Sequence, residues 1–145
     1  MIFATMLRLQ LEKILKDNNL TITKNRKDVL KVFVDNKKPL KLKSIRSLLK
    51  NIDRVTVFRI LGIFERHQII HKIHFNYNSI FYALCNNDCN VNDDKHSHDH
   101  IHFVCEECND VSCVSIGIFP KITLPQHVLK SFSINASGLC SKCNV

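Results

Sequence analysis

The segment DRVTVFRILGIFERHQIIHKIHF, residues 53–75, changes from a helical to an extended hydrophobic pattern within a few residues. Its first part carries one apolar stripe at helical spacing, formed by Val57, Ile60, Leu61 and Phe64. Asp53, directly before this stripe, is a good N-cap residue. The last part, IIHKIHF, is rich in β-branched and aromatic residues, which favour a strand. The segment therefore predicts a helix followed at once by a β-strand.

The sequence on either side of this segment completes a small α+β pattern. After it, SIFYAL predicts a second strand, joined to the first through a turn at residues 76–78. Before it, residues 24–36 and 41–52 each have an amphipathic helical pattern, and Leu7, Leu11, Ile14 and Leu15 predict an amphipathic N-terminal helix. Helices followed by a hairpin in a basic segment are typical of a winged helix, whose last helix enters the major groove of DNA.

The charge of the chain favours a polyanionic partner. Lysine and arginine outnumber aspartate and glutamate by 21 to 13, which gives a net charge of +8 at pH 7. Double-stranded DNA is the simplest such partner, and a merely soluble basic surface is the alternative. The candidate DNA contacts are Arg26, Arg54, Thr56, Phe58 and Arg59. We expect Arg59 and Phe58 at base edges and Arg26 and Arg54 at phosphates, unless Phe58 belongs to the core.

The second half of the chain has a different composition. All seven cysteines lie from Cys85 onward, and residues 86–97 are polar and rich in Asn and Asp, as in a linker. We therefore predict a DNA-binding domain at 1–85, a hinge at 86–97 and a second domain at 98–145. HIHFVC, DVSCVSI and residues 128–136 predict strands in that second domain.

Four of the cysteines form the pattern CxxC…CxxC: Cys105, Cys108, Cys140 and Cys143. Two such turns supply four thiolates in a tetrahedron, which suits a structural Zn²⁺ and leaves no open position for a substrate. Two disulfides or four free thiols are the alternatives. The sequence shows no export signal, so a cytoplasmic location and reduced thiols are expected, which favours the metal.

A catalytic function is not indicated. There is no GxSxG motif, no P-loop and no glycine-rich loop, and the chain has only three glycines. Neither a catalytic residue nor a small-molecule substrate is therefore predicted. No apolar run approaches the roughly 18–20 residues of a membrane span, so no membrane association is expected either.

Four motifs occur in an order that resembles the ferric uptake regulator family. They are TKNRKDVL (23–30), DRVTVFRIL (53–61), HDHIHFVCEEC (98–108) and GLCSKC (138–143). The resemblance covers about Leu20 to Cys143. The zinc uptake branch is the most similar, because the hairpin HKIHFNYNSIFYALC, residues 71–85, opens with His and closes with Cys as it does there.

The resemblance implies an N-terminal winged-helix DNA-binding domain followed by a small, zinc-stapled, β-rich dimerisation domain. It implies a homodimeric, metal-responsive repressor that binds a palindromic operator, senses zinc and controls metal uptake genes. The implied regulatory Zn²⁺ ligands are His71, Cys85, His98 and Cys113, which would clamp one domain against the other. Cys113 stands where the branch has Glu, and Cys89 is a rival for the sulfur position of Cys85. A looser match suggests a second regulatory site of Asp99, His100, His102 and His127.

Two alternatives remain open. The first is an Fe²⁺ or peroxide sensor of the same family, although Lys38-Pro39-Leu40 stands where the iron branch has a ligand His, and Ala83 where it has a ligand Glu. The second is a zinc-stapled protein-interaction module without DNA activity. The family also has a long helix in its dimer domain, for which Gly117–Pro125 is too short and interrupted by proline. We therefore expect dimerisation to rest mainly on strand pairing and on the site of four cysteine sulfurs.

Overall fold

The computed structural model describes residues 2–75, 79–85, 100–118, 120–129 and 132–145. It divides into two compact units, Met1–Cys85 and Asn86–Val145. The predicted turn at 76–78 and the predicted hinge at 86–97 lie outside the described residues. Each unit is considered by itself below.

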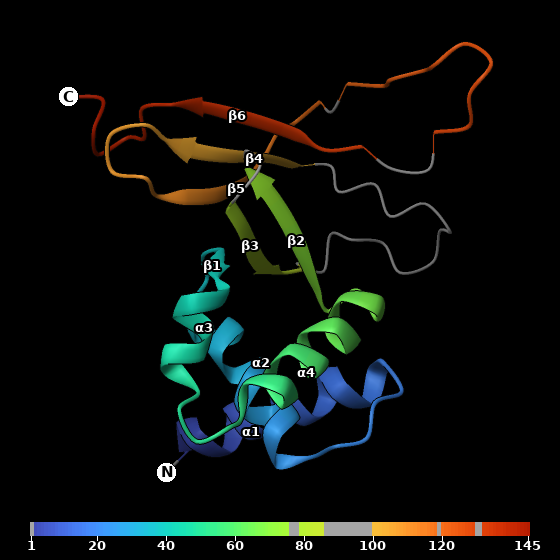
Figure 1. Ribbon diagram of the computed structural model, residues 1–145, viewed down its shortest axis with the longest axis vertical. Helices are drawn as coiled ribbons and strands as arrows, with labels where there is room; N and C mark the ends of the chain where they lie inside the picture. The colour runs from blue at the N-terminus through green and yellow to red at the C-terminus, as the bar shows by residue number, and fades with distance from the viewer. Residues whose placement is uncertain (1, 76–78, 86–99, 119, 130–131) are drawn as a thin grey trace. The chain divides into compact units, whose positions relative to one another are not determined.

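Four helices form the base of the first unit (Figure 1): α1 (Ile2–Asp17), α2 (Lys24–Asp35), α3 (Leu42–Leu48) and α4 (Arg54–Arg66). Two of them begin at the side-chain caps that the sequence provides. Thr23 accepts a hydrogen bond from the backbone N–H of Arg26, and Asp53 accepts one of 3.0 Å from that of Thr56. The carboxylate of Asp53 is stabilised by Thr56, which lowers its pKa. The predicted N-cap of α4 is thus confirmed.

A three-stranded antiparallel sheet completes this unit, in the order β1-β3-β2. It contains β1 (Leu40–Lys41), β2 (Ile70–Phe75) and β3 (Ser79–Leu84). The β2–β3 hairpin was predicted, whereas β1 was not, because two residues carry no detectable period. β1 joins the hairpin through Leu40, the partner of Tyr82. The helices and this hairpin form the predicted winged helix.

The core of the first unit lies between the helices and one face of the hairpin. Its fully buried members include Leu15, Leu30, Phe33, Leu61 and Phe64. Ile70 and Tyr82 join the same cluster from the hairpin. Ile52, just before the cap of α4, and Val57, one turn into it, are buried in this cluster too, which fixes the direction in which the chain enters α4. The exposed side of α4 is therefore held in place by the packing of its other side.

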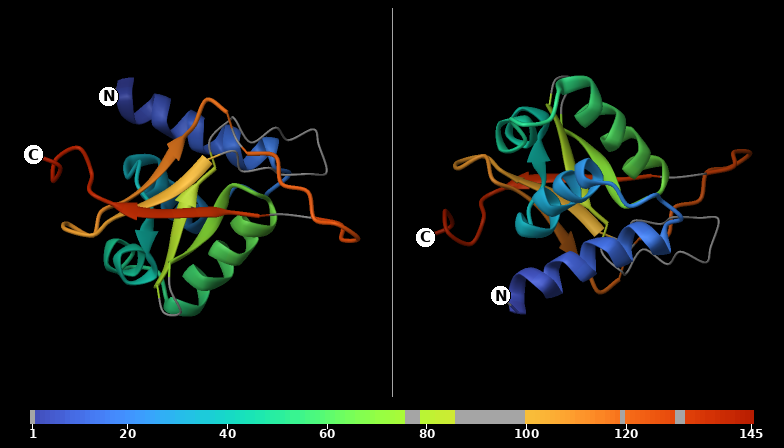
Figure 2. Two further views of the ribbon diagram at one scale, coloured as in Figure 1. Left: turned by 90° about the horizontal axis from the view of Figure 1, so that it is seen from above. Right: turned by 90° about the horizontal axis from the view of Figure 1, so that it is seen from below.

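The second unit is built on a three-stranded sheet of β4 (His100–Cys105), β5 (Val111–Ser115) and β6 (Ile134–Gly138). β4 lies in the centre, antiparallel to β5 and parallel to β6 (Figure 2). The strand predicted at 128–136 was placed too early. A strand needs a partner, and β4 offers one only from Ile134, which pairs with Ile101, to Gly138. Val128 is 90% exposed, outside any strand.

This second unit has little hydrophobic core. Among its described residues, the buried apolar ones are Cys105 and Val111. A sheet that buries so little apolar area needs another source of stability. No described helix of the chain is both long and apolar enough to cross a membrane.

Candidate metal centres and nucleic-acid interface

The parallel pairing of β4 and β6 brings the two CxxC turns together. Both turns follow the carboxyl end of a strand, and Cys105 is the register partner of Gly138. The carboxyl ends of parallel strands meet at one edge of a sheet, so the turns face each other there. The four sulfur atoms of Cys105, Cys108, Cys140 and Cys143 all lie within 4.8 Å of one another. The sequence predicted this set, and the structure brings it together.

Electrostatics at this edge favour a bound cation. Backbone N–H groups of Cys108 and Cys140 stabilise the Cys105 thiolate and lower its pKa to about 6. The neighbouring sulfur atoms, that of Cys140 first, raise the pKa of Cys143 to about 12. Four thiolates cannot stay ionised so close together without a cation between them. A tetrahedral sulfur-four set with a backbone hydrogen bond of 3.4 Å from Cys140 to the Cys105 sulfur fits Zn²⁺.

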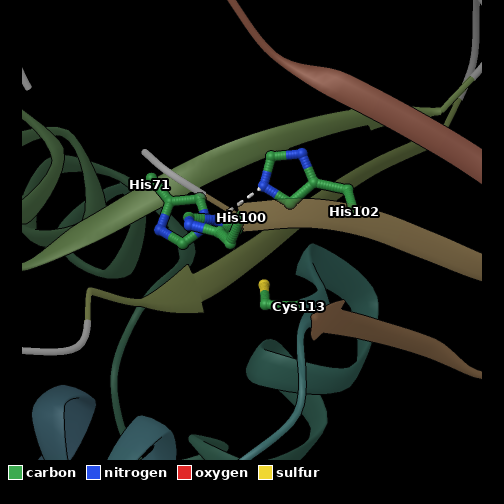
Figure 3. A group of neighbouring side chains, drawn as sticks. All are labelled: His71, His100, His102 and Cys113. Carbon is green, nitrogen blue, oxygen red and sulfur yellow. Dashed lines mark hydrogen bonds between the residues drawn. The ribbon is translucent and has the colours of Figure 1, made fainter. Parts of the chain in front are cut away.

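A second group of soft ligands lies on the same sheet, away from the cysteine edge. His100 and His102 are two residues apart on β4 and therefore share a face, and Cys113 on β5 is the register partner of His102. Each of the three offers one ligand atom within 4.8 Å of the others. Figure 3 shows the two imidazoles turned toward each other, with Nε2 atoms 3.0 Å apart. Two nitrogens and one sulfur at this spacing suit a transition metal such as Zn²⁺.

Asn135 orients one of these imidazoles. It is the register partner of His102 on β6, and its Oδ1 lies 3.3 Å from Nδ1 of His102. If Nδ1 donates its N–H to this oxygen, the lone pair of Nε2, the atom nearest His100, points to a metal ligand role. No local pattern indicated this residue, because its partner is 33 positions away in the chain.

The first unit holds a smaller pair of the same chemistry. His71 is the second residue of β2, and Cys85 directly follows β3. The Cys85 N–H extends the ladder by donating to the carbonyl of Ile69 over 2.9 Å. This register brings the Cys85 sulfur to 3.4 Å from Nδ1 of His71. The resemblance predicted both residues as ligands of one metal, and the hairpin holds them at a distance that allows it.

The remaining predicted ligands fall in different places. His98, Asp99 and Cys89 lie outside the described residues, so the predicted role of His98 stays a prediction. His127 lies in an exposed turn, where its Nδ1 is 2.6 Å from the carbonyl oxygen of Pro125. Sequence reasoning placed His100 and His102 with Asp99 and His127. The structure places Cys113 beside these two histidines, and their grouping with Asp99 stays a prediction.

One face of α4 is available for DNA. Phe58 is 58% exposed and Arg54 and Arg59 are exposed beside it, so Phe58 is not a core residue. Thr56 is half-buried, and its backbone is engaged by Asp53. Arg26 is also half-buried, and its Nη1 donates to the Thr21 carbonyl over 2.7 Å, so part of its guanidinium secures the start of α2.

Two features of this face were missed at the level of sequence. Val55 is 64% exposed on the same helix as Phe58, and an exposed Val at the start of the helix could have signalled an apolar contact surface. The charge is also concentrated in the segment that contains this helix. Residues 37–66 contain nine lysines and arginines and two acidic residues, a formal charge of +7 in a chain whose net charge is +8.

Comparison with known proteins agrees with this arrangement. The model of the ferric uptake regulator family matches residues 17–123. The ferric uptake regulation protein of Staphylococcus epidermidis is 31% identical over 137 residues, covering 90% of this chain and 92% of that protein.

Solved structures show the same fold. A zinc uptake regulator complexed with zinc and DNA has a TM-score of 0.64 at 22% identity, covering 97% of this chain and 93% of that one. The ferric uptake regulator of Vibrio cholerae has a TM-score of 0.61 at 22% identity, covering 88% and 98%. The chain is therefore no enzyme: it belongs to the ferric uptake regulator family of metal-responsive transcriptional regulators.

Proposed function

We propose that this protein is a zinc-sensing transcriptional repressor, acting as a homodimer on a palindromic operator and controlling metal uptake genes. The observation that supports zinc is the donor set of His100, His102 and Cys113 within 4.8 Å. Two imidazoles and a thiolate are soft to borderline ligands that favour Zn²⁺, whereas Mn²⁺ is better suited to carboxylate and carbonyl oxygens. A structural neighbour was solved with zinc and DNA together, which is consistent with this choice.

The proposed response comes from ligands that belong to two units. His71 and Cys85 are contributed by the first unit, and His100, His102 and Cys113 by the second, in addition to the predicted His98. Zn²⁺ is almost always four-coordinate, so one ion takes four ligands from this pool. An ion that draws on both units restricts their relative motion and holds two winged helices at the spacing of an operator. Without it, DNA affinity falls by the fraction of molecules in unsuitable arrangements.

A metal titration tests the zinc assignment. Protein that retains its structural metal is titrated with buffered Zn²⁺, Fe²⁺ or Mn²⁺ under reducing, oxygen-free conditions. The zinc-loaded protein is first used to select a duplex from random sequences. The affinity for this duplex is then measured at each metal concentration. We expect Zn²⁺ to activate binding at the lowest free concentration. Activation by Fe²⁺ at its ordinary cellular level, with no response to Zn²⁺ at its own, would make this an iron sensor instead.

Cys113 is the residue that should set the metal preference. Cys113→Glu replaces the sulfur by a hard oxygen and is expected to weaken the zinc response and to improve the responses to Fe²⁺ and Mn²⁺. Loss of a partner outside the ligand shell already costs roughly 10–100-fold in metal affinity, so a changed ligand should cost at least as much. The matched control is Ser112→Glu, which adds the same charge to β5 on its other face. Equal metal profiles for the two variants would remove Cys113 from the site.

The proposed DNA face divides into base-reading and phosphate-binding residues. Arg59→Ala should relax the preference among duplex sequences, because an arginine at a base edge discriminates by about 1–3 kcal/mol. Lys43→Ala should weaken all duplexes alike and reduce the slope of log K against log salt by about one unit. Competition binding with specific and random duplexes separates the two. Uniform weakening by both substitutions would place Arg59 on the backbone.

A further inference from the structure

A small basic pocket lies at the turn between α3 and α4, within the first unit. Its volume is about 260 Å³, and it is lined by Arg46, Leu49, Lys50, Ile52 and Arg54. Leu49 and Ile52 are 4% and 8% exposed and belong to the core, so they form a firm apolar floor. The three cations come from the last turn of α3, the connecting turn and the first residue of α4. The packing of the core thus fixes the backbone positions of the three basic residues.

The charge of this pocket is not neutralised locally. Within the described part of the chain, no ion pair or side-chain hydrogen bond involves Arg46, Lys50 or Arg54. Asp53 adjoins the pocket in sequence, but its carboxylate is occupied by the cap of α4. By contrast, several cations of α1 and α2 have carboxylate partners, such as Lys13 with Asp17 and Lys31 with Asp35. Three convergent cations without an anion indicate a site for an external one.

The position of the pocket indicates which anion it takes. It lies at the N-terminus of the 13-residue helix α4, where the helix dipole favours negative charge. Val55, which is exposed, follows Arg54 directly, and Phe58 and Arg59, which we assign to the bases, lie one turn further along α4. In helix-turn-helix docking, the recognition helix enters the groove by its N-terminal residues while the preceding helix crosses the backbone. A group bound at the turn is therefore next to the sugar-phosphate chain that borders the groove.

We infer that Arg46, Lys50 and Arg54 form a clamp for a phosphodiester of the DNA backbone, with Leu49 and Ile52 facing the adjoining sugar. This inference rests on the DNA binding of the proposed function and adds the residues that set the position of α4 along the groove. Phosphate contacts fix register and orientation without reading sequence. The clamp therefore determines which base pairs Phe58 and Arg59 meet.

The test combines two substitutions with chemically neutralised phosphates. In Arg46→Gln/Lys50→Gln the side-chain sizes are roughly kept and two charges are removed. Its control, Lys13→Gln/Lys31→Gln, removes two charges that carboxylates already neutralise. Each protein is measured against a set of selected duplexes in which one phosphate at a time is replaced by an uncharged methylphosphonate.

The wild-type protein should lose affinity at one particular phosphate in each half-site. The clamp variant should bind all duplexes more weakly, with a salt slope smaller by about one unit for each bound copy, and should be indifferent to neutralisation of that one phosphate. The control variant should retain the wild-type pattern. A clamp variant that stays as sensitive as wild type to every neutralised phosphate would overturn the inference, as would equal losses in the control.

Two further measurements distinguish the phosphate clamp from the proposed zinc response and from a site for a soluble anion. The salt slope on a random duplex at low salt, without added metal, reports the clamp even if the zinc response fails, so the two proposals fail independently. Calorimetry of DNA-free protein with inorganic phosphate examines the other source of the same chemistry. Micromolar binding of free phosphate that the clamp variant loses, together with an unchanged methylphosphonate pattern, would assign the pocket to a soluble anion and overturn the DNA assignment.

Discussion

Cys140→Ser is expected to unfold the second unit and to leave the first unit folded. The substitution removes one of four sulfur ligands at the edge where β4 and β6 meet. Structural zinc binding contributes roughly 10 kcal/mol or more, and the whole stability of a domain is about 5–15 kcal/mol. Since Cys105 and Val111 are the buried apolar residues among those described there, little else can hold these strands.

Three measurements on the purified variant check this expectation. Metal analysis should show about one zinc fewer per chain than in wild type, because three thiolates bind far more weakly than four. Size-exclusion chromatography should show a monomer or an aggregate in place of the proposed dimer. Far-ultraviolet circular dichroism should retain the helical signal of α1 to α4, which belong to the other unit. Treatment of the wild-type protein with a strong chelator should give the same chromatographic and circular dichroism results.

Cys89→Ser is the matched control, because Cys89 lies outside the two CxxC motifs. It should retain its zinc, its oligomeric state and its melting temperature. A Cys140→Ser protein that keeps the stability and the size of this control would contradict the structural role of the sulfur-four site. The edge would then be held by strand pairing alone.

The helices and the sulfur-four site could be predicted because their signals are local. Asp53 and the apolar stripe behind it specify α4 within a few residues, and each CxxC turn specifies a pair of ligands by itself. The strands β1 and β6 were harder to predict from the sequence. Leu40–Lys41 becomes a strand only because Tyr82 lies opposite, and β6 starts at Ile134 because β4 accepts a partner there. Such pairings depend on distant residues that a local pattern does not contain.

Dependence on distant residues also explains which parts of the proposed regulatory metal site could be predicted. Cys113 was predicted, but its grouping with His102 depends on the register between β4 and β5, and the contribution of Asn135 depends on the register with β6. Residue type and spacing indicated a metal site in this region and could not divide the histidines among sites. The basic pocket near α4 was equally hidden, because Arg46, Lys50 and Arg54 converge only through the packing of Leu49 and Ile52.

Loss of the metal response without loss of the fold is the expected result for Cys113→Ser. Cys113 lies outside the sulfur-four edge, so the second unit should keep its structural zinc and its strands. The zinc-dependent rise in DNA affinity should disappear. An allosteric coupling of ordinary size, 1–3 kcal/mol, corresponds to a rise of roughly 5–150-fold. His102→Ala should behave in the same way, whereas Cys89→Ser should respond like wild type.

Metal content and DNA binding must be measured together for this variant. The expected result is about one tightly held zinc per chain, an unchanged dimer, and an affinity for the selected duplex that is the same with and without added Zn²⁺. A response that survives in Cys113→Ser and is lost in Cys89→Ser would move the sulfur ligand to Cys89. A protein that loses both zincs would show that Cys113 supports the fold rather than the response.

A double variant decides whether the ligands of the two units hold the same ion. Cys85→Ser removes the sulfur that the first unit places 3.4 Å from His71, and Cys113→Ser removes that of the second unit. If both bind one zinc, either substitution alone abolishes the coupling and the double variant loses nothing more, because residues that act through one shared partner are not additive. If each unit binds its own ion, the losses add and part of the response survives each single substitution. Additive losses would contradict the proposed clamp, because an ion confined to one unit cannot restrict the motion between the two.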